Sequence, residues 1–371
     1  MIMNTETLLP VLALLQVDGV GDIVAKKLIH HCGSADEVFK AKSSFLQRID
    51  GVGEVLIKKL KDKSVFEKAI SELEFIEKEK LQVLYFQNDD YPERLKHCID
   101  GPVLLFASGN FDLKNRKIIS IVGTRQVTTY GKEFTKQFIE DIAPFNPIIV
   151  SGFAYGVDII AHQFAMENHL QTIGVLAHGL NQIYPPSHKK HVSRMEQNGG
   201  FMTEFWSKSN PDKENFVRRN RIVAGMSEAT IVIESAEKGG SLITANIANE
   251  YSRDVFAVPG RTSDKYSKGC NDLIKSQRAH LMTSAADLVY LLNWELKSIK
   301  HQDKSIQKQL FVSLDHEEQK IYNYLQQNGK QLLDIIALEC DFPIFRISTL
   351  LLNMELKGFI RPLPGKLYEA I

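Results

Sequence analysis

Three short stretches of this 371-residue chain combine glycine, hydroxyl and arginine side chains in patterns that can bind phosphate. The first, Gly123-Thr124-Arg125, directly follows the apolar run 118–122. Glycine lets backbone N–H groups approach an anion, and an arginine can grip a phosphate through two parallel hydrogen bonds. The stretch is not a dinucleotide fingerprint, because Arg125 stands where the second glycine of G-x-G-x-x-G would be. Arg125 is therefore predicted to bind phosphate, or else to pair with a carboxylate at the sheet edge.

The second stretch is an arginine cluster within residues 216–225, formed by Arg218, Arg219, Asn220 and Arg221. At helical spacing Arg218 and Arg221 share one face, so the three arginines cannot all point the same way. This cluster suits phosphate binding, and its alternative is a solvated basic turn.

The third stretch, Gly239-Gly240-Ser241, opens a predicted helix, whose N-terminal N–H groups attract anions. Its alternative is that Ser241 only caps the helix.

Alternating strands and helices must position these stretches. Short apolar runs predict buried strands, with helical segments such as 130–143 and 215–225 between them. The second strand ends in another glycine turn, Ser151-Gly152-Phe153. Ligands of open α/β sheets bind beyond the carboxyl ends of the strands, where these turns lie. We therefore predict an α/β fold with a doubly wound, Rossmann-like parallel sheet. The predicted strands are 82–86, 103–106, 118–122, 148–150, 172–176, 201–203, 230–234 and 255–258.

An internal repeat predicts a separate helical domain over residues 1–80. The segments 17–21 and 49–53 both read apolar-Asp-Gly-Val-Gly and precede helical runs, which resembles a tandem helix-hairpin-helix motif. These two glycine turns fit either of two roles: contact with DNA, or a purely structural connection between helices. Contact is favoured by Lys26, Lys27, Lys58 and Lys59 and disfavoured by Asp18, Asp22, Asp50 and Glu54.

The C-terminal part predicts a further domain. The Rossmann-like domain spans residues 81–295, and the polar, Lys- and Gln-rich segment 296–312 reads as a linker. Residues 313–371 then give three helices and a β-hairpin, an order that resembles a winged helix. Its third helix, 343–357, carries only two basic residues. A protein-interaction or structural role is therefore favoured over entry into a DNA groove.

Bulk composition excludes several classes of protein. The net formal charge is zero, so any nucleic-acid surface must be local. Neither a membrane-spanning run nor a signal-peptide pattern is visible. The four cysteines are scattered without metal-ligand spacing, which predicts a reducing cytoplasm and no metal. No nucleophile elbow or Walker A sequence occurs, so we predict neither catalytic residues nor a cofactor, and a binding protein rather than an enzyme.

These motifs occur together in an order that resembles one family. The set includes Ile121 to Arg125, Ser151 to His162, Tyr184-Pro185, Arg219 to Gly225, Gly240 to Ala245, Phe256 to Gly260 and Gly269 to Ile274. Together they resemble the DNA-processing protein A family (DprA, also called Smf), over residues 85–290. The resemblance implies a single-stranded DNA-binding protein of natural transformation, which protects incoming DNA and helps to load the RecA recombinase.

The resemblance also implies site residues and assembly. Arg125 and, near the Tyr-Pro turn, Lys189 or Lys190 correspond to DNA-contacting positions, and Phe153 and Tyr155 could stack on bases. A homodimer is implied through the Rossmann-like domain, at about residues 271–292. The alternative is a nucleotide-binding or phosphoribohydrolase-like enzyme of the same Rossmann variant. The expected DNA or phosphate contacts are Gly123, Thr124, Arg125, Ser151, Gly152, Phe153, Lys189, Lys190, Arg218, Arg219, Asn220, Arg221, Gly240 and Ser241.

Overall fold

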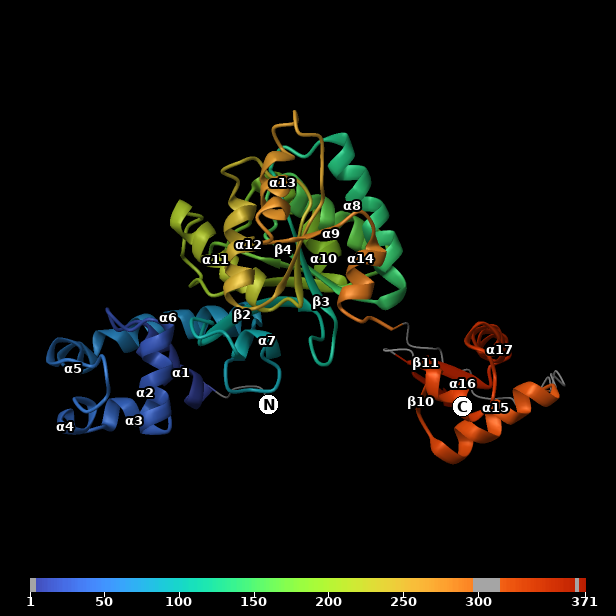
Figure 1. Ribbon diagram of the computed structural model, residues 1–371. Helices are drawn as coiled ribbons and strands as arrows, with labels where there is room; N and C mark the ends of the chain where they lie inside the picture. The colour runs from blue at the N-terminus through green and yellow to red at the C-terminus, as the bar shows by residue number, and fades with distance from the viewer. Residues whose placement is uncertain (1–4, 296–313, 364–366) are drawn as a thin grey trace. The chain divides into compact units, whose positions relative to one another are not determined.

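The structure, a computed structural model, describes residues 5–295, 314–363 and 367–371. The chain forms two compact units, residues 1–297 and 298–371 (Figure 1). The predicted linker 296–312 lies outside the described residues. None of the described helices combines the length and the apolar character that crossing a membrane would need.

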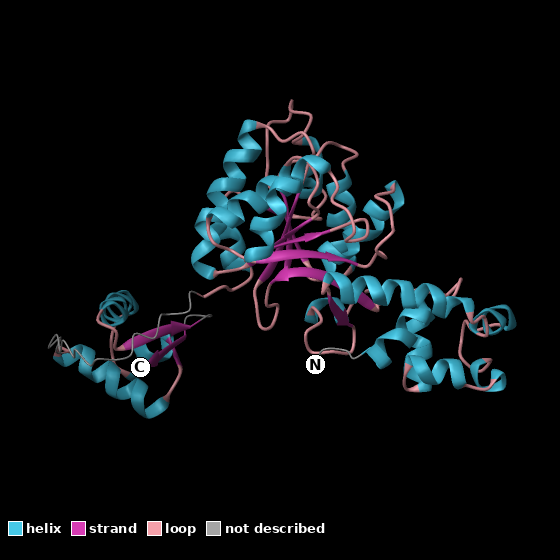
Figure 2. Ribbon diagram, turned by 180° about the vertical axis from the view of Figure 1, so that it is seen from behind, coloured by secondary structure: helices cyan, strands magenta, loops and turns pink. Residues whose placement is uncertain are grey.

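A nine-stranded sheet forms the centre of the first unit, with helices on both sides (Figure 2). The strand order is β1-β2-β6-β5-β4-β3-β7-β8-β9. Strands β3 to β9 pair in parallel, whereas β2 pairs antiparallel to β6 and β1 antiparallel to β2. The predicted doubly wound sheet is thus confirmed. The strands are β1 Gln82–Tyr85, β2 Leu104–Asn110, β3 Ile118–Val122, β4 Ile148–Ser151, β5 Thr172–Val175, β6 Gly199–Thr203, β7 Ala229–Val232, β8 Asp254–Ala257 and β9 His280–Leu281.

Alternate residues of each central strand pack against helices on opposite faces of the sheet. In β3, Ile119 and Ile121 face α8, α9 and α14, while Ile118 and Val122 face α11, α12 and α13. Burial on both faces explains why these strands read as continuous apolar runs. The helices are α7 Glu93–Lys96, α8 Thr129–Ile142, α9 Val157–Glu167, α10 Lys189–Gln197, α11 Lys213–Gly225, α12 Gly240–Glu250, α13 Lys268–Lys275 and α14 Ala285–Leu291, with short 3-10 turns at Ala143–Phe145 and Pro186–His188.

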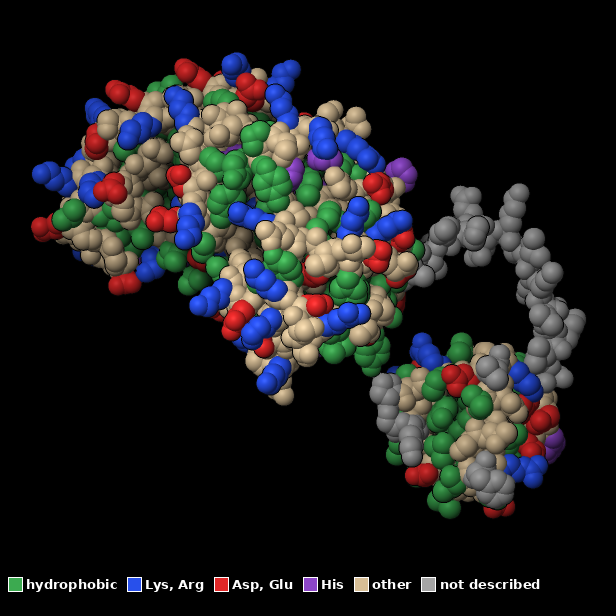
Figure 3. All heavy atoms as spheres, turned by 90° about the horizontal axis from the view of Figure 1, so that it is seen from above, with side chains coloured by type: hydrophobic (Ala, Val, Ile, Leu, Met, Phe, Trp, Pro, Cys, Tyr) green, Lys and Arg blue, Asp and Glu red, His purple; other side chains and the backbone are tan. Residues whose placement is uncertain are grey.

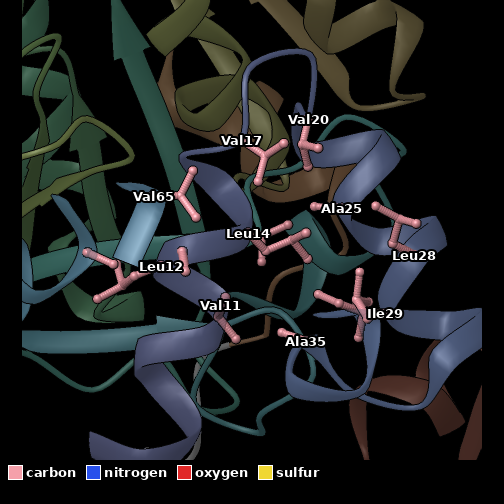
Figure 4. Packing of buried hydrophobic residues seen from close by; sticks show 14 of the residues in the cluster. Val11, Leu12, Leu14, Val17, Val20, Ala25, Leu28, Ile29, Ala35 and Val65 are labelled. Carbon is pink, nitrogen blue, oxygen red and sulfur yellow. The ribbon is translucent and has the colours of Figure 1, made fainter. Parts of the chain in front are cut away.

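The N-terminal helices pack onto β1 and β2 instead of standing apart. Leu12 and Leu28 lie in one hydrophobic cluster with Tyr85 and Phe106 of the sheet, and Figure 4 shows part of this cluster. The buried carboxylate of Glu72 accepts hydrogen bonds from the backbone and hydroxyl of Ser207, at 2.8 and 2.6 Å. The helices are α1 Thr5–Leu15, α2 Asp22–Cys32, α3 Ala35–Lys40, α4 Ser43–Leu46, α5 Glu54–Leu60 and α6 Ser64–Glu79.

Both Gly-Val-Gly segments form tight turns between helices, as predicted. Gly19 and Gly51 have φ angles of 91° and 84°, which favour glycine. Each repeat is tied to the other, because Lys27 pairs with Asp50 (3.0 Å) and Lys59 pairs with Asp18 (2.5 Å). Two lysines that favoured DNA contact are therefore already paired, and DNA contact by these turns stays a prediction.

The second unit has the predicted winged-helix order. Its core contains Ile321, Leu325, Ile336 and Leu351, and its three strands are ordered β10-β12-β11. The two-residue strand β10 was not predicted, since it is too short to leave a pattern. The predicted hairpin tip, 364–366, lies outside the described residues. The elements are α15 His316–Asn328, β10 Gln331–Leu332, α16 Leu333–Glu339, α17 Ile344–Leu356, β11 Ile360–Leu363 and β12 Leu367–Ala370.

Candidate nucleic-acid interface

A cavity of 510 Å³ opens where the carboxyl ends of β3, β4 and β7 meet the first turns of α11 and α12. The chain continues from β3 to β4 on one side and returns to β7 on the other, so this is the switch point of the sheet. All three predicted phosphate-binding stretches contribute to its wall. The lining residues that matter here are Gly123, Thr124, Arg125, Gly152, Lys213, Phe216, Arg219, Asn220, Gly239, Gly240 and Ser241.

Arg125 lies exposed at this cavity and makes no ion pair with any residue that the structure describes. Its guanidinium lies over the ring of Phe216, 5.4 Å from the centroid. Pairing with a carboxylate, the alternative that the sequence left open, is not observed. A cation held by a ring face keeps its N–H donors directed outward, so Arg125 is free to bind an anion.

The N-terminus of α8, directly after the Arg125 turn, is already occupied. The Glu234 carboxylate accepts hydrogen bonds from the backbone N–H of Thr128 (2.9 Å) and from its hydroxyl (2.5 Å). The Thr128 hydroxyl in turn accepts from the N–H of Gly131, at 3.2 Å. A negative charge therefore already occupies the positive end of this helix. The position of Arg125 just before the predicted helix 130–143 favours a phosphate that meets its guanidinium and free N–H groups of that helix start together, and this expectation is wrong because Glu234 already lies there.

The N-terminus of α12 is open on the same cavity. Gly239 is its N-cap residue and no side chain caps the helix, so Ser241 is not the cap that the sequence allowed. The Ser241 hydroxyl donates inward to the Ser235 hydroxyl, at 2.9 Å. A Cβ at Gly240 would meet no atom within 4 Å, so the space beside this backbone is empty. Uncapped N–H groups at a helix start attract anions, which gives the cavity a second source of positive potential.

Arg219 lies buried in the floor of the cavity and holds the strand ends together. Its guanidinium donates to the carbonyl oxygens of Gly152 (2.6 Å) and Val175, and burial lowers its pKa to about 10. Gly152 has no side chain because a Cβ there would overlap this guanidinium. The Asp158 carboxylate accepts from the Gly152 N–H (3.2 Å), and burial raises its pKa. Arg219 therefore has a structural role, with few donors left for DNA.

The other two arginines of the cluster point away from the cavity, toward the N-terminal helices. Arg218 and Arg221 both donate to the Glu204 carboxylate at 2.6 Å and lie within 3.5 and 3.1 Å of Asp22. Burial raises the pKa of Glu204 to about 7 despite its two arginine partners. The structure thus separates Arg218 and Arg221 from Arg125. Through Asp22 and Glu204, Arg218 and Arg221 join α2 to the sheet.

Two residues of the second turn are inaccessible. Phe153 is fully buried against His188 and Phe201, so the expectation that it stacks on bases is wrong. Ser151 is also fully buried, and its hydroxyl donates to the Ile121 carbonyl at 2.6 Å. Tyr155, by contrast, is 46% exposed.

The two lysines at the start of α10 are available for binding. Lys189 and Lys190 lie exposed at the start of that helix and make no ion pair among the described residues. Neither lysine lines the cavity. A DNA strand could meet them only after leaving the cavity mouth.

Sequence reasoning missed an aromatic and basic wall on α11. The half-buried ring of Phe216 lines the cavity, and the 39%-exposed Tyr184 ring lies 5.9 Å from it. Lys213, one turn earlier on the same helix, also lines the cavity. The spacing Lys-x-x-Phe at the start of a helix was the available signal, because residues three apart share a face.

Among the described residues, no three His, Cys, Asp or Glu side chains are grouped as metal ligands would be. The cavity and its rim therefore offer a ligand the free Arg125 guanidinium, Lys213 and the open N-terminus of α12. They also offer an aromatic shelf, formed by the rings of Phe216 and Tyr184. Groups of these kinds are able to bind phosphate and to stack on planar rings.

Sequence comparisons agree with this geometry. The family model described as DNA recombination-mediator protein A matches residues 82–293. The chain belongs to this family. A second model, described as the DprA winged helix domain, matches residues 309–366. The residues matched by the first model include all those that line the cavity, and the residues matched by the second include most of the second unit.

Named relatives share most of the chain. Protein Smf of Escherichia coli (strain K12) is 33% identical over 300 residues, covering 80% of this chain and 79% of that protein. The X-ray structure of DNA processing protein A from Streptococcus pneumoniae superposes with a TM-score of 0.62 at 30% identity, covering 76% of this chain and 96% of that one. DNA processing protein A from Helicobacter pylori, whose structure describes its single-stranded DNA binding mode, gives a TM-score of 0.51 at 28% identity, covering 58% of this chain and 98% of that one.

Proposed function

We propose that this protein binds single-stranded DNA along the mouth of the 510 Å³ cavity. The observation that carries this proposal is Arg125, which is exposed, lacks an ion pair among the described residues and lies over the ring of Phe216. In the proposed complex, one phosphate binds the Arg125 guanidinium, and the open N-terminus of α12 attracts the same or the next phosphate.

The aromatic shelf favours single strands over duplexes. Unpaired bases can stack on Phe216 and Tyr184, whereas the bases of a duplex present only their edges. Lys213 at the cavity, and Lys189 and Lys190 on α10, would neutralise further phosphates along the strand. The single-stranded DNA binding mode described for the Helicobacter pylori relative supports the same polymer as ligand.

Fluorescence anisotropy with a labelled oligothymidine and a duplex of equal length, at two salt concentrations, tests this proposal. We expect tighter binding of the single strand, with an affinity that falls as salt rises. Equal affinity for both forms, or binding that does not respond to salt, would contradict it.

The family resemblance also implies a cellular role for the bound DNA strand. We propose that the bound strand is protected during natural transformation and then passed to the RecA recombinase. A nuclease-protection assay and a RecA-filament assay on DNA precoated with single-strand-binding protein test the two steps. A protein that binds the strand normally, yet neither slows nuclease digestion nor speeds filament growth, would leave the binding intact and refute the role.

Assembly as a homodimer is also proposed, through residues 271–292. Strand β9 is the edge of the sheet, its two residues are exposed, and Leu281 is 51% exposed. Leu291 is 38% exposed, whereas Leu288 is fully buried in the core and cannot join an interface. The proposed interface is therefore the β9 edge with the outer side of α14.

A nucleotide-binding or phosphoribohydrolase-like function is the second candidate, because the cavity lies at the switch point where such folds bind nucleotides. Asp158 is the one carboxylate among the described residues that line this cavity, and it already accepts hydrogen bonds from the backbone N–H groups of Gly152 and Ala154, at 3.2 and 3.3 Å. We propose that the protein does not turn over nucleotides. Release of base or phosphate from mononucleotides, abolished by Arg125→Ala, would favour the enzyme instead.

A further inference from the structure

The winged-helix unit presents an acidic and apolar surface in place of a basic one. All five of its described lysines and arginines are engaged. Four bind carboxylates: Arg346 to Glu317, Lys357 to Glu318, and Lys330 and Arg361 to Glu369. The fifth, Lys320, donates to the Cys340 carbonyl at 2.8 Å and lies over the Phe342 ring. This unit therefore offers no free cation among its described residues for DNA phosphates.

Apolar side chains are exposed on the two helices that would face a ligand in a winged helix. Leu338 near the end of α16 is 73% exposed, and Ile344 at the start of α17 is 58% exposed. Ile335 on α16 and Leu352 on α17 are 39% and 54% exposed. Figure 3 shows hydrophobic side chains gathered on the surface of this unit. So many large apolar groups on a small unit indicate a binding surface.

Unpaired carboxylates lie on the same two helices. Asp334, Glu339 and Asp341 accompany Leu338 on α16 and the turn that follows, and each is exposed without an ion pair among the described residues. Glu355 extends the outward stripe of α17, which reads Ile344, Ser348, Leu352 and Glu355 at helical spacing. A DNA backbone brought to this stripe would meet like charge and apolar groups.

We propose that this surface, made of α16 and the outward stripe of α17, binds a basic amphipathic helix of a partner protein. The apolar face of such a helix would bury Leu338 and Ile344, and its lysines or arginines would pair with Asp334, Glu339 and Asp341. Helices with an apolar stripe and a charged face bind in this way to exposed apolar surfaces. The charge complementarity selects a basic partner helix over an acidic one, and a protein over a nucleic acid.

A short synthetic amphipathic helix of leucine and lysine, titrated into the full chain, tests the proposal by fluorescence anisotropy. The double variant Leu338→Ser, Ile344→Ser should weaken binding at least tenfold, and Asp334→Lys with Glu339→Lys should do the same. The matched control is Asp89→Lys with Asp90→Lys, which makes the same charge change at two exposed carboxylates of the first unit and should leave the affinity unchanged.

Circular dichroism and the melting temperature show whether each variant keeps its fold, and Leu338→Met, which keeps the apolar surface, should bind as the native chain does. The proposal is overturned if the peptide does not bind, or if it binds all variants equally well. It is also overturned if a peptide with glutamate in place of lysine binds as tightly, or if labelled duplex DNA binds the native chain and this binding is lost in the Leu338→Ser, Ile344→Ser variant. None of these outcomes bears on the cavity of the first unit.

Discussion

Replacement of Phe216 by leucine is expected to weaken single-strand binding without unfolding the protein. The Phe216 ring lines the cavity, carries the Arg125 guanidinium on one face and has Tyr184 at 5.9 Å. It is half-buried on α11 and lies outside the hydrophobic core clusters of the sheet. Leucine keeps the apolar contact and a high helix propensity. We therefore expect the free energy of unfolding to change by less than about 1 kcal/mol.

The magnitude follows from two lost interactions. A base stacked on an aromatic ring contributes about 1–3 kcal/mol. The cation–π contact that orients Arg125 contributes about 0.5–1 kcal/mol at an exposed site. Because about 1.4 kcal/mol corresponds to a factor of ten, the affinity for oligothymidine should fall between about tenfold and several hundredfold.

Fluorescence anisotropy at fixed salt measures this loss, with Phe216→Tyr as the matched control. Tyrosine keeps the ring, so its affinity should stay within about threefold of the native value, since most of the stacking energy is kept. Native affinity in Phe216→Leu would refute the stacking argument. An equal loss in the leucine and tyrosine variants at unchanged melting temperatures would refute it as well.

Three further predictions concern stability and assembly. The buried His162 imidazole, whose pKa burial lowers from 6.5 to about 3, stays neutral in the fold, so protonation of the unfolded chain removes stability as pH falls below 6.5. At pH 5 the free energy of unfolding is lower by about 2 kcal/mol for this reason. The urea midpoint should therefore change less between pH 7 and pH 5 in His162→Asn than in the native chain. Equal changes in the two proteins would count against this prediction. Gly156→Ala should lower the melting temperature, because φ is 77° and a Cβ would overlap the Thr124 carbonyl, at a cost of about 1–3 kcal/mol; Gly240→Ala, with open space around it, is the control and should melt normally. Leu281→Lys on the β9 edge should give a monomer by light scattering at a concentration where the native chain is a dimer, and a native monomer would contradict the proposed interface.

Most of the fold was predictable because local patterns and tertiary packing agree. The central strands are buried on both faces, so their sequences are continuous apolar runs that end in glycine turns. Docking of the N-terminal helices was not predictable. Besides the hydrophobic cluster that these helices share with β1 and β2, it depends on polar contacts between distant residues, such as Glu72 with Ser207 and Asp22 with Arg221, which leave no periodic pattern.

The site was predictable only in part, because position after a strand does not determine where a side chain points. Arg125 was identified from its residue type and place, and the structure puts it at the cavity. Phe153 follows β4 in the same way, yet its φ angle of 57° and its packing turn the ring into the core. Glu234 lies two residues after the end of β7 and accepts hydrogen bonds at the start of α8, a contact that sequence spacing cannot reveal.

The most direct test of the central proposal is the salt dependence of single-strand binding by Arg125→Glu. The matched control is Lys114→Glu, which makes the same charge change at an exposed residue before β3, at the opposite end of that strand. We predict a strong loss of affinity, a log–log salt slope lower by about 0.7 for each lost phosphate contact, and an unchanged melting temperature, with native behaviour in the control. Native affinity and slope in a folded Arg125→Glu protein would contradict the proposal that DNA binds at this cavity.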